Sequence, residues 1–372
     1  MQKPWTYMIV RLLFLVFVAA AICAAKTPTV VVGVNVCDEY FVPQATQDIE
    51  IKYLEKNGVK TVRTGLNPNT IYFITQAYQH GIGCVVILYP DSGSKVKLRW
   101  RGSRAEAPLS QVNPQSFAEW LKPLFDKLEA AGVHLTAFEL GNEINTSEFN
   151  GDLLTPGSGR VLAVSDLNNP NDPEAPIIVA GYKKYLQIAA VVKDLRDHSK
   201  LNQTTPIVSA GMAEWGRPGP RSWNGELGVG APDAIEFLRQ NGIDKLVDGY
   251  GVHVYPNADP HDPIPHRMKH LDRMFAACRQ DTKPCWLTEW GFSNASQSCP
   301  VDDKTRVQLI KAERTAFQKY VKEGRLAATI FYNWTGNPGP WTEKTVGLKA
   351  DPPSIFRCCA LTEAGKLALS PM

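Results

Sequence analysis

Two glutamates stand where a carboxylate could do chemistry. The stretch FELGNEIN (138–145) places Glu143 just after an apolar run typical of a buried strand, and WLTEWGF (286–292) places Glu289 in a similar setting. Acidic residues are rarely buried unless they are paired or used in a reaction. Two carboxylates that face each other can serve as general acid and nucleophile in glycosidic bond cleavage. The fold must then bring the two strand ends together.

Apolar runs alternate with amphipathic stretches along the chain, and this alternation predicts eight strand-then-helix units. The expected strands cover 29–36, 59–66, 83–90, 133–140, 206–212, 247–256, 285–292 and 327–334. The helices after them are expected near 44–57, 70–81, 114–132, 180–198, 233–242, 266–280, 302–324 and 361–369. Mostly apolar strands that alternate with helices are typical of a parallel sheet, so we expect a single (β/α)8 TIM barrel.

The loops support this interpretation. Helix-to-strand links are short and marked by glycine, whereas the long polar loops nearly all follow strands, at 91–112, 144–178, 213–231, 256–265, 293–302 and 335–358. In a barrel such loops gather on the face that carries the active site, where Glu143 on strand four and Glu289 on strand seven would both point. The alternative is a doubly wound open sheet, but no glycine-rich phosphate loop follows the first strand.

With these strands assigned, the chain resembles the retaining glycoside hydrolases of clan A, the 4/7 superfamily barrels, in a family 5-like or family 39-like form. The resemblance rests on GNE (141–143) and TEWG (288–291), and it extends in outline from about Val31 to Trp334. It implies that Glu143 is the acid/base and that Glu289 is the nucleophile of a double displacement.

The resemblance also implies roles at other strand ends. Asn142 would contact the sugar 2-hydroxyl, and Arg63 would hydrogen-bond to the nucleophile. His253 and Tyr255 in GVHVYP are similar to a strand-six pair whose tyrosine lies near the nucleophile. Trp334 resembles the strand-eight tryptophan that forms the floor of the first sugar subsite.

Physical chemistry sets requirements for both carboxylates. Glu143 must hold a proton near neutral pH, so its pKa should be raised, whereas Glu289 must be ionised and needs cationic or hydrogen-bonding neighbours. Arg63 and Tyr255 are of the right type to supply them. A retaining enzyme needs a carboxyl separation of about 5–5.5 Å, against about 6.5–9.5 Å for an inverting one. Glu139 is expected deeper in the barrel, as a structural carboxylate paired with Arg63 or another inward cation.

Three further features could be functional, but each also has an ordinary structural explanation. Tryptophans in the loops could stack on sugars or only pack, and Trp290 and Trp334 are the better candidates for stacking among Trp100, Trp215, Trp223, Trp290, Trp334 and Trp341. The basic stretch KVKLRWRGSR (95–104) could meet an anionic polysaccharide, although a solvated loop balanced by acids elsewhere is favoured. His266 and His270 have i, i+4 spacing, but no glutamate follows the first histidine. We therefore expect no metal and no cofactor.

The N-terminal stretch predicts export. Residues 1–25 carry Lys3 and Arg11 before the apolar run LLFLVFVAAAICAA, which is typical of a cleavable signal peptide; an uncleaved anchor and lipidation at Cys23 are the alternatives. The rest, 26–372, is expected to be one catalytic domain. Without Lys3 and Arg11 the formal net charge falls from +3 to +1, which offers no argument for a nucleic-acid partner.

Seven cysteines follow the expected signal peptide. An exported protein meets oxidising conditions, so some of them should pair. Cys278 and Cys285 bracket RQDTKP between a helix and a strand and are the first candidate pair. An odd number leaves at least one thiol over.

Together these features predict a secreted or periplasmic retaining glycosidase that cleaves β-glycosidic bonds in a polysaccharide or oligosaccharide. Endo-action is favoured because long loops after strands three, four and eight suggest a cleft, while exo-action stays open. We expect a monomer with no nucleic-acid partner and no membrane contact after signal cleavage. The alternatives are a catalytically inactive glycan-binding barrel at the cell surface or in a matrix, and a barrel that hydrolyses a different bond.

Overall fold

Eight apolar segments of the chain pair side by side as parallel strands. The computed structural model describes residues 29–37, 42–154, 159–214, 218–220, 225–278, 283–294, 299, 301–335, 344 and 352–372. Within these ranges the main sheet runs in the order β10-β11-β12-β1-β2-β3-β6-β8. Parallel bridges from Val208 to Gly249 and from Met212 to Val252 bring its two ends together. The predicted (β/α)8 barrel is confirmed.

Every strand overlaps the stretch that the sequence predicts for it. The strands are β1 (Val31–Asn35), β2 (Thr61–Gly65), β3 (Gly83–Leu88), β6 (Ala137–Leu140), β8 (Ile207–Val208), β10 (Tyr250–Val254), β11 (Cys285–Trp290) and β12 (Leu326–Phe331). β8 is the shortest of them, and the chain beyond it stays beside its neighbours through single bridges at Gly211 and Met212. This irregular fifth strand lies directly beside the candidate catalytic residues of its neighbours.

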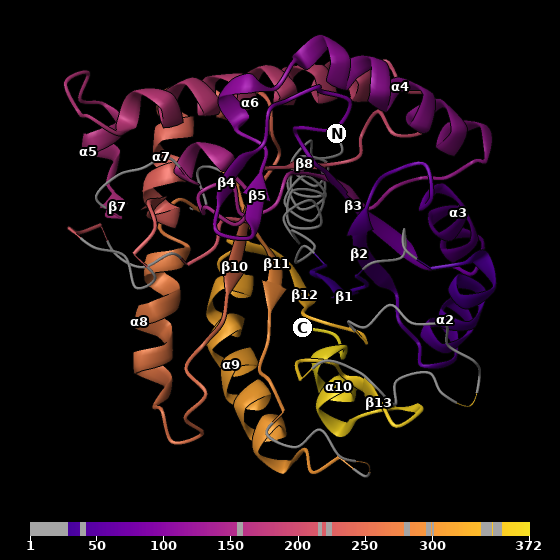
Figure 1. Ribbon diagram of the computed structural model, residues 1–372. Helices are drawn as coiled ribbons and strands as arrows, with labels where there is room; N and C mark the ends of the chain where they lie inside the picture. Colours follow the sequence, from indigo (N-terminus) through magenta and orange to yellow (C-terminus); the bar gives the residue numbers. More distant parts are fainter. Residues whose placement is uncertain are drawn as a thin grey trace, which may run out of the picture.

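Helices cover the outside of the barrel (Figure 1). They are α2 (Gln44–Lys56), α3 (Ile71–Gln79), α4 (Pro114–Ala130), α6 (Ala175–Asp197), α7 (Ala231–Gln240), α8 (Ile264–Met274), α9 (Lys304–Lys322) and α10 (Glu363–Ala368). α4 shows why they form where they do. Asn113 caps it by accepting hydrogen bonds from the amides of Gln115 and Ser116, and Pro114 occupies its first position, where no amide hydrogen is needed.

The loops that follow the strands contain small elements that the sequence analysis did not predict. A hairpin of β4 (Arg99–Arg101) and β5 (Arg104–Glu106) lies in the expected loop 91–112. Other short elements are α5 (Val164–Leu167) and the strand pairs β7 (Val161–Leu162) with β9 (Gly228–Val229) and β13 (Phe356–Arg357) with β14 (Ala360–Leu361). Strands this short carry too little periodicity to be read from sequence.

The core is divided by the strands into two layers. Side chains of a strand point alternately to its two faces, so Val86 and Phe138 pack outward against the helices while Val85 and Ala137 fill the barrel interior. The same alternation turns Arg63 and Glu139 inward above this apolar floor. The interior is thus apolar at the bottom and charged towards the mouth.

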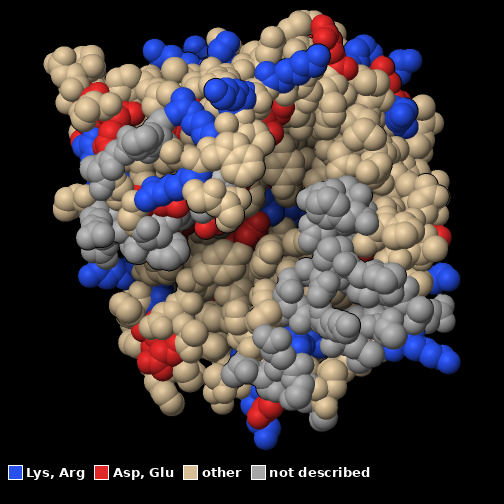
Figure 2. Space-filling view, viewed as in Figure 1, with Lys and Arg blue, Asp and Glu red and all other residues tan. Residues whose placement is uncertain are grey.

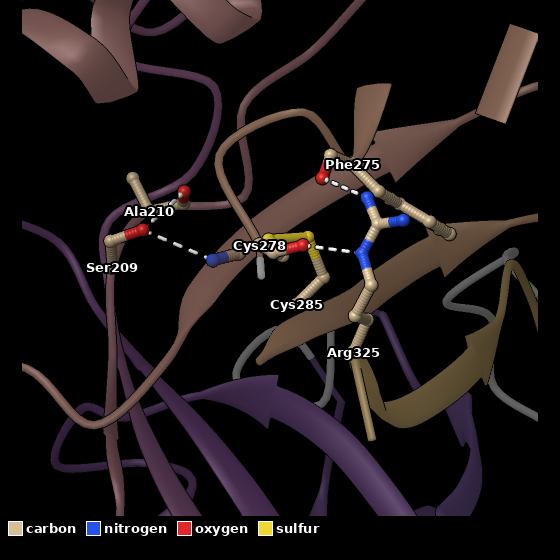
Figure 3. The surroundings of a disulfide bond; sticks show 7 residues. Ser209, Ala210, Phe275, Cys278, Cys285 and Arg325 are labelled. Atoms are coloured by element: carbon tan, nitrogen blue, oxygen red, sulfur yellow. Dashed lines mark hydrogen bonds between the residues drawn. A yellow bond between two sulfur atoms is a disulfide. The ribbon is translucent and has the colours of Figure 1, made fainter. Parts of the chain in front are cut away.

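The disulfide predicted between Cys278 and Cys285 is present (Figure 3). Beside it, the Arg325 guanidinium donates hydrogen bonds to the carbonyls of Phe275 (2.8 Å) and Cys278 (2.6 Å). A second disulfide joins Cys299 and Cys358; among the described residues Cys37, Cys84 and Cys359 are not part of a disulfide. Two disulfides agree with an oxidising compartment.

The predicted signal peptide, residues 1–25, lies outside the described residues. Across the described ranges, none of the helices is both long and apolar enough to cross a membrane.

Candidate active site

Polar side chains from five strand ends meet at the mouth of the barrel. Some of them, including Arg63, Asn142 and Glu289, line a cavity of about 240 Å³. Figure 2 shows a hollow near the centre of this face in which basic and acidic side chains lie close together. The strand ends that the sequence analysis selected therefore converge on one site.

Arg63 on β2 is the centre of the hydrogen-bond network. Its Nε and Nη2 donate to the two Glu139 oxygens at 2.5 and 3.0 Å, and Nη2 also donates to Asn142 Oδ1 at 2.8 Å. Its Nη1 donates to Asn35 Oδ1 and to Glu289 Oε1, both at 2.7 Å. These contacts use all five N–H donors of a guanidinium. Arg63 is held in a single orientation with its positive charge against the candidate nucleophile.

Glu139 has the structural role that the sequence predicts. It is fully buried, binds Arg63 and accepts a hydrogen bond from the Thr288 hydroxyl at 2.8 Å. Removing one partner of such a buried pair costs about 3–5 kcal/mol because the other charge stays buried and uncompensated. Substitution of Arg63 would therefore damage the fold as well as the site, and it is a poor test of chemistry.

Glu289 faces the cavity because β11 contains a bulge. Val252 pairs with Leu287 but His253 pairs with Glu289, so Thr288 is an extra residue in the ladder. A bulge re-aims the side chains next to it. As a result Thr288 reaches Glu139 while Glu289, its immediate neighbour, reaches Arg63.

The surroundings of Glu289 favour its ionised form. Burial alone would raise its pKa, but the charges of His253 and Arg63 and the hydrogen bond from Tyr255 outweigh burial and lower the pKa below 4.5. The Tyr255 hydroxyl donates to Glu289 Oε2 at 2.6 Å. Burial and the Glu289 charge raise the pKa of Tyr255, so that its phenol keeps the proton that it donates. Both neighbours named from the sequence, Arg63 and Tyr255, contact Glu289.

Glu143 follows β6 in a left-handed backbone conformation, with φ of 43°. Residues with a side chain rarely adopt this region, and here the Glu143 amide is held by a 2.9 Å hydrogen bond to the Gly211 carbonyl. The turn aims the carboxylate at His253, whose Nδ1 lies 2.7 Å from Glu143 Oε1. One carboxylate oxygen each of Glu143 and Glu289 lie within 4.8 Å of each other.

His253 on β10 is buried between the carboxylates. Burial would lower its pKa, but the charges of Glu289 and Glu143 and the hydrogen bond with Glu143 raise the pKa above 6.5. Gly211 makes room for the ring, because a Cβ there would lie 2.0 Å from His253 Nε2. The glycine therefore has two effects at the site: it holds the Glu143 backbone and admits the imidazole.

Asn142 presents its amide to the cavity. Its Oδ1 is fixed by Arg63, and within the described part of the chain its Nδ2 makes no hydrogen bond. An amide held in this way is oriented to donate to a hydroxyl of a bound ligand.

The two tryptophans expected to stack on sugar do not face the cavity. Trp290 is fully buried with its ring edge-on to Phe317 and Phe331, and Trp334 is fully buried and stacked on Phe356. A ring with no exposed face cannot contact a sugar, so both are packing residues in this structure.

The aromatic wall of the cavity comes instead from Tyr89, Phe149 and Tyr332. Tyr332 lies edge-on to Tyr255, with ring centroids 6.3 Å apart. The sequence analysis missed these three residues. Tyr89 and Tyr332 lie near the ends of the predicted strands 83–90 and 327–334, and this position was the available signal; Phe149 lies inside a long loop and had none.

The remaining candidates from the sequence form ion pairs with acidic residues and do not join the site. His266 pairs with Asp262 and His270 pairs with Glu214, so the two imidazoles do not share a ligand. In the basic stretch 95–104, Arg99 lies near Asp152 and Arg101 near Glu226, so acids elsewhere balance part of its charge.

Glu143, His253 and Glu289 could in principle hold a metal ion, since one ligand atom of each lies within 4.8 Å of the others. Both oxygens of Glu289 already accept hydrogen bonds, from Arg63 and Tyr255. The positive charge of the Arg63 guanidinium, which lies 2.7 Å from Glu289, would also repel a cation bound there. The donor set suits a carboxylate pair better than a metal.

The fold is that of many known glycosidases. We found no protein-family model and no curated protein that matches this chain. Among solved structures, a fungal β-1,4-galactanase is similar with a TM-score of 0.52 and 14% identity, over 86% of this chain and 90% of its own. An endo-1,4-β-mannanase from Rhizomucor miehei is similar with a TM-score of 0.50 and 14% identity, over 92% and 93%.

A β-D-glucuronidase from Dictyoglomus thermophilum is similar with a TM-score of 0.53 and 12% identity, over 92% of this chain. This chain spans about half (50%) of the length of that enzyme. Identities this low establish the shared barrel and leave the activity to be argued from the site.

Proposed function

We propose that this protein is a retaining glycoside hydrolase that cleaves β-glycosidic bonds by double displacement. The observation that carries the proposal is the pair of carboxylates, Glu143 and Glu289, with oxygens within 4.8 Å of each other. This spacing of the nearest oxygens is closer to the separation of about 5–5.5 Å in retaining enzymes than to the about 6.5–9.5 Å of inverting ones, so it supports a retaining pair.

The two carboxylates divide the chemistry by their environments. Glu289, kept ionised by Arg63 and Tyr255, attacks the anomeric carbon and forms the glycosyl-enzyme ester. Glu143 gives its proton to the leaving oxygen, and the bond to the aglycone breaks. Glu143 then takes a proton from the water that attacks the ester, which releases the sugar with its configuration retained. His253 lies against Glu143 and orients it, while Asn142 donates to a hydroxyl of the reacting sugar.

The substrate that fits best is a β-linked poly- or oligosaccharide, and endo-action remains our preferred mode. The similar barrels include a β-1,4-galactanase and an endo-1,4-β-mannanase, which supports a β-glycan without identifying the sugar. An exported enzyme would meet such polymers outside the cell, and the two disulfides support export.

The test is release of reducing ends from a panel of β-1,4-galactan, mannan, glucan, xylan and a β-linked uronan. Wild type should act on at least one of them, and Glu289→Gln should lower the rate by about 10³-fold or more because it removes the nucleophile. Glu236→Gln, at an exposed carboxylate on α7, is the matched control and should keep full activity. Proton NMR of the first product should show the β-anomer.

Glu143→Ala separates the acid/base from the nucleophile. On an aryl glycoside with a good leaving group, this variant should form the glycosyl-enzyme and then stall, because nothing deprotonates the water. Azide needs no base, so it should restore turnover and yield a β-glycosyl azide. An α-anomeric product, or full activity of Glu289→Gln, would refute the mechanism. Binding without hydrolysis would favour the inactive glycan-binding barrel.

A further inference from the structure

The β4–β5 hairpin carries the most exposed large apolar side chain in the described part of the molecule. Trp100, at the middle of β4, is 67% exposed. Its partner across the hairpin is Ala105, whose small side chain covers little of the indole. A tryptophan left open on a paired strand offers a flat apolar face that a ligand can cover.

The hairpin is fastened to the body of the protein by the residues on either side of Trp100. Arg99 lies 3.9 Å from Asp152, and Arg101 donates to the Gly225 carbonyl at 3.3 Å with Glu226 3.8 Å away. Because alternate residues of a strand point to opposite faces, these two arginines face the body and Trp100 faces outward.

The surface under the hairpin is the segment that leaves the catalytic strand. The Gly151 amide donates to the Ala107 carbonyl at 2.9 Å, and a Cβ on Gly151 would lie only 2.4 Å from the Glu106 carbonyl oxygen. Glu226, beside Arg101, accepts a hydrogen bond from Ser147, four residues after Glu143.

This packing connects Trp100 to the catalytic cavity. Phe149, which lines the cavity, lies in the same segment between the two anchor points Ser147 and Gly151, and it is itself 37% exposed. Phe149 and Trp100 are therefore exposed aromatic residues on two segments that pack against each other, one at the cavity wall and one on the hairpin. The flanking arginines are paired with acids, so what the hairpin offers a ligand is an aromatic face rather than a charge.

We infer that Trp100 is an outer sugar-stacking platform, on which a pyranose ring of the glycan chain lies while the bond to be cleaved lies between Glu143 and Glu289. The C–H face of a pyranose ring matches the flat, electron-rich face of an indole. This inference rests on the proposed function, and it specifies that function: the substrate must be a chain long enough to reach from the cavity to the hairpin.

The experiment compares a polymeric substrate with a short one. Trp100→Ala should lower kcat/KM on the polymer by about three- to tenfold, the range expected for one aromatic contact, and leave kcat/KM on an aryl monoglycoside unchanged. Trp100→Phe should keep most of the activity on the polymer because a ring remains. Tyr78→Ala removes an exposed aromatic on the outer helix α3 and should change neither rate.

Two results would overturn the inference: an unchanged rate on the polymer, or an equal loss on both substrates, which would indicate general damage. Binding of β-linked hexasaccharides to Glu289→Gln, with and without Trp100→Ala, separates this inference from the proposed function. If Trp100→Ala hydrolyses the polymer as fast as wild type, Trp100 is not a sugar-stacking platform, but the proposed glycosidase function is unaffected. Trp100-dependent binding without hydrolysis by wild type supports the platform and refutes the glycosidase. No binding to any glycan in the panel overturns the inference.

Discussion

At the scale of single residues, the site is organised by one cation between carboxylates with different tasks. Arg63 binds both the buried Glu139 and the proposed nucleophile Glu289, and it can do both because a guanidinium offers five donors in a fixed plane. A lysine could supply the charge but not this geometry.

His253 provides a prediction at the residue scale. Its pKa is raised in the folded state by Glu289 and Glu143, with Glu139 and Arg63 also close to its ring. Stability from its protonated form is therefore fully present below pH 6.5, the unfolded value, and is lost as pH rises through the folded pKa. Wild type should therefore exceed His253→Asn in free energy of unfolding by less and less as the pH rises through the folded-state pKa of His253.

Denaturant titrations at closely spaced pH values, with the same buffer and salt throughout, measure that difference. Asn keeps a neutral donor near Nδ1 and cannot titrate, so it isolates the charge. A gap that stays constant, or widens as pH rises, would contradict the assignment.

At the scale of elements, two irregular strands orient the proposed catalytic side chains. The bulge in β11 turns Glu289 towards the cavity, and the short β8 leaves Gly211 free to hold the backbone of Glu143. In a regular strand only every second side chain points into the barrel. The bulge in β11 and the irregular end of β8 allow neighbouring residues to point inward together.

Gly211→Ala tests the contribution of β8. The new methyl would lie 2.0 Å from His253 Nε2, so the imidazole and then Glu143 must move, and misplacement of a catalytic group by about 1 Å can cost about 10²-fold in rate. We expect kcat to fall by about that factor.

Gly132→Ala is the control for the glycine substitution. Its φ is 74° and no atom approaches the added Cβ within 4 Å, so only backbone strain results. It should lose about 1 kcal/mol of stability and keep its kcat. If the two variants lost activity equally, Gly211 would have no special role at the site.

At the scale of the whole molecule, a closed parallel barrel brings residues from distant parts of the chain to one mouth. Arg63 and Glu289 are 226 positions apart in sequence and 2.7 Å apart in space. The C-terminal segment is joined to this barrel by a disulfide: Cys358, in the turn between β13 and β14, is linked to Cys299 after β11.

The two disulfides should differ in their effect on stability. Cys299–Cys358 closes a loop of 59 residues and Cys278–Cys285 one of 7. From the entropy of loop closure, double Ser variants should lose about 4 kcal/mol for the long loop and about 2 kcal/mol for the short one. Calorimetry and denaturant unfolding of the two variants measure these losses of stability. A larger loss on removal of the short-loop disulfide would contradict the prediction.

The sequence by itself determined the barrel and the strand ends that carry the proposed catalytic residues. Apolar runs and glycine-marked turns are local signals, and eight of them in alternation with helices leave few possible folds. Glu143, Glu289, Arg63 and Tyr255 could be placed at strand ends because residue type and strand position are both readable from the chain. The disulfide between Cys278 and Cys285 was readable for the same reason, since its partners are seven residues apart.

Only the tertiary structure decided which neighbours those residues meet. Trp334 and Trp290 are buried while Tyr332 and Phe149 line the cavity, because exposure depends on the packing of elements that are distant in sequence. The bulge at Thr288 depends on how β11 pairs with β10, and no local pattern encodes that register. Residue types and strand positions can be read from the sequence, whereas the contacts that orient the side chains form only when distant strands pair.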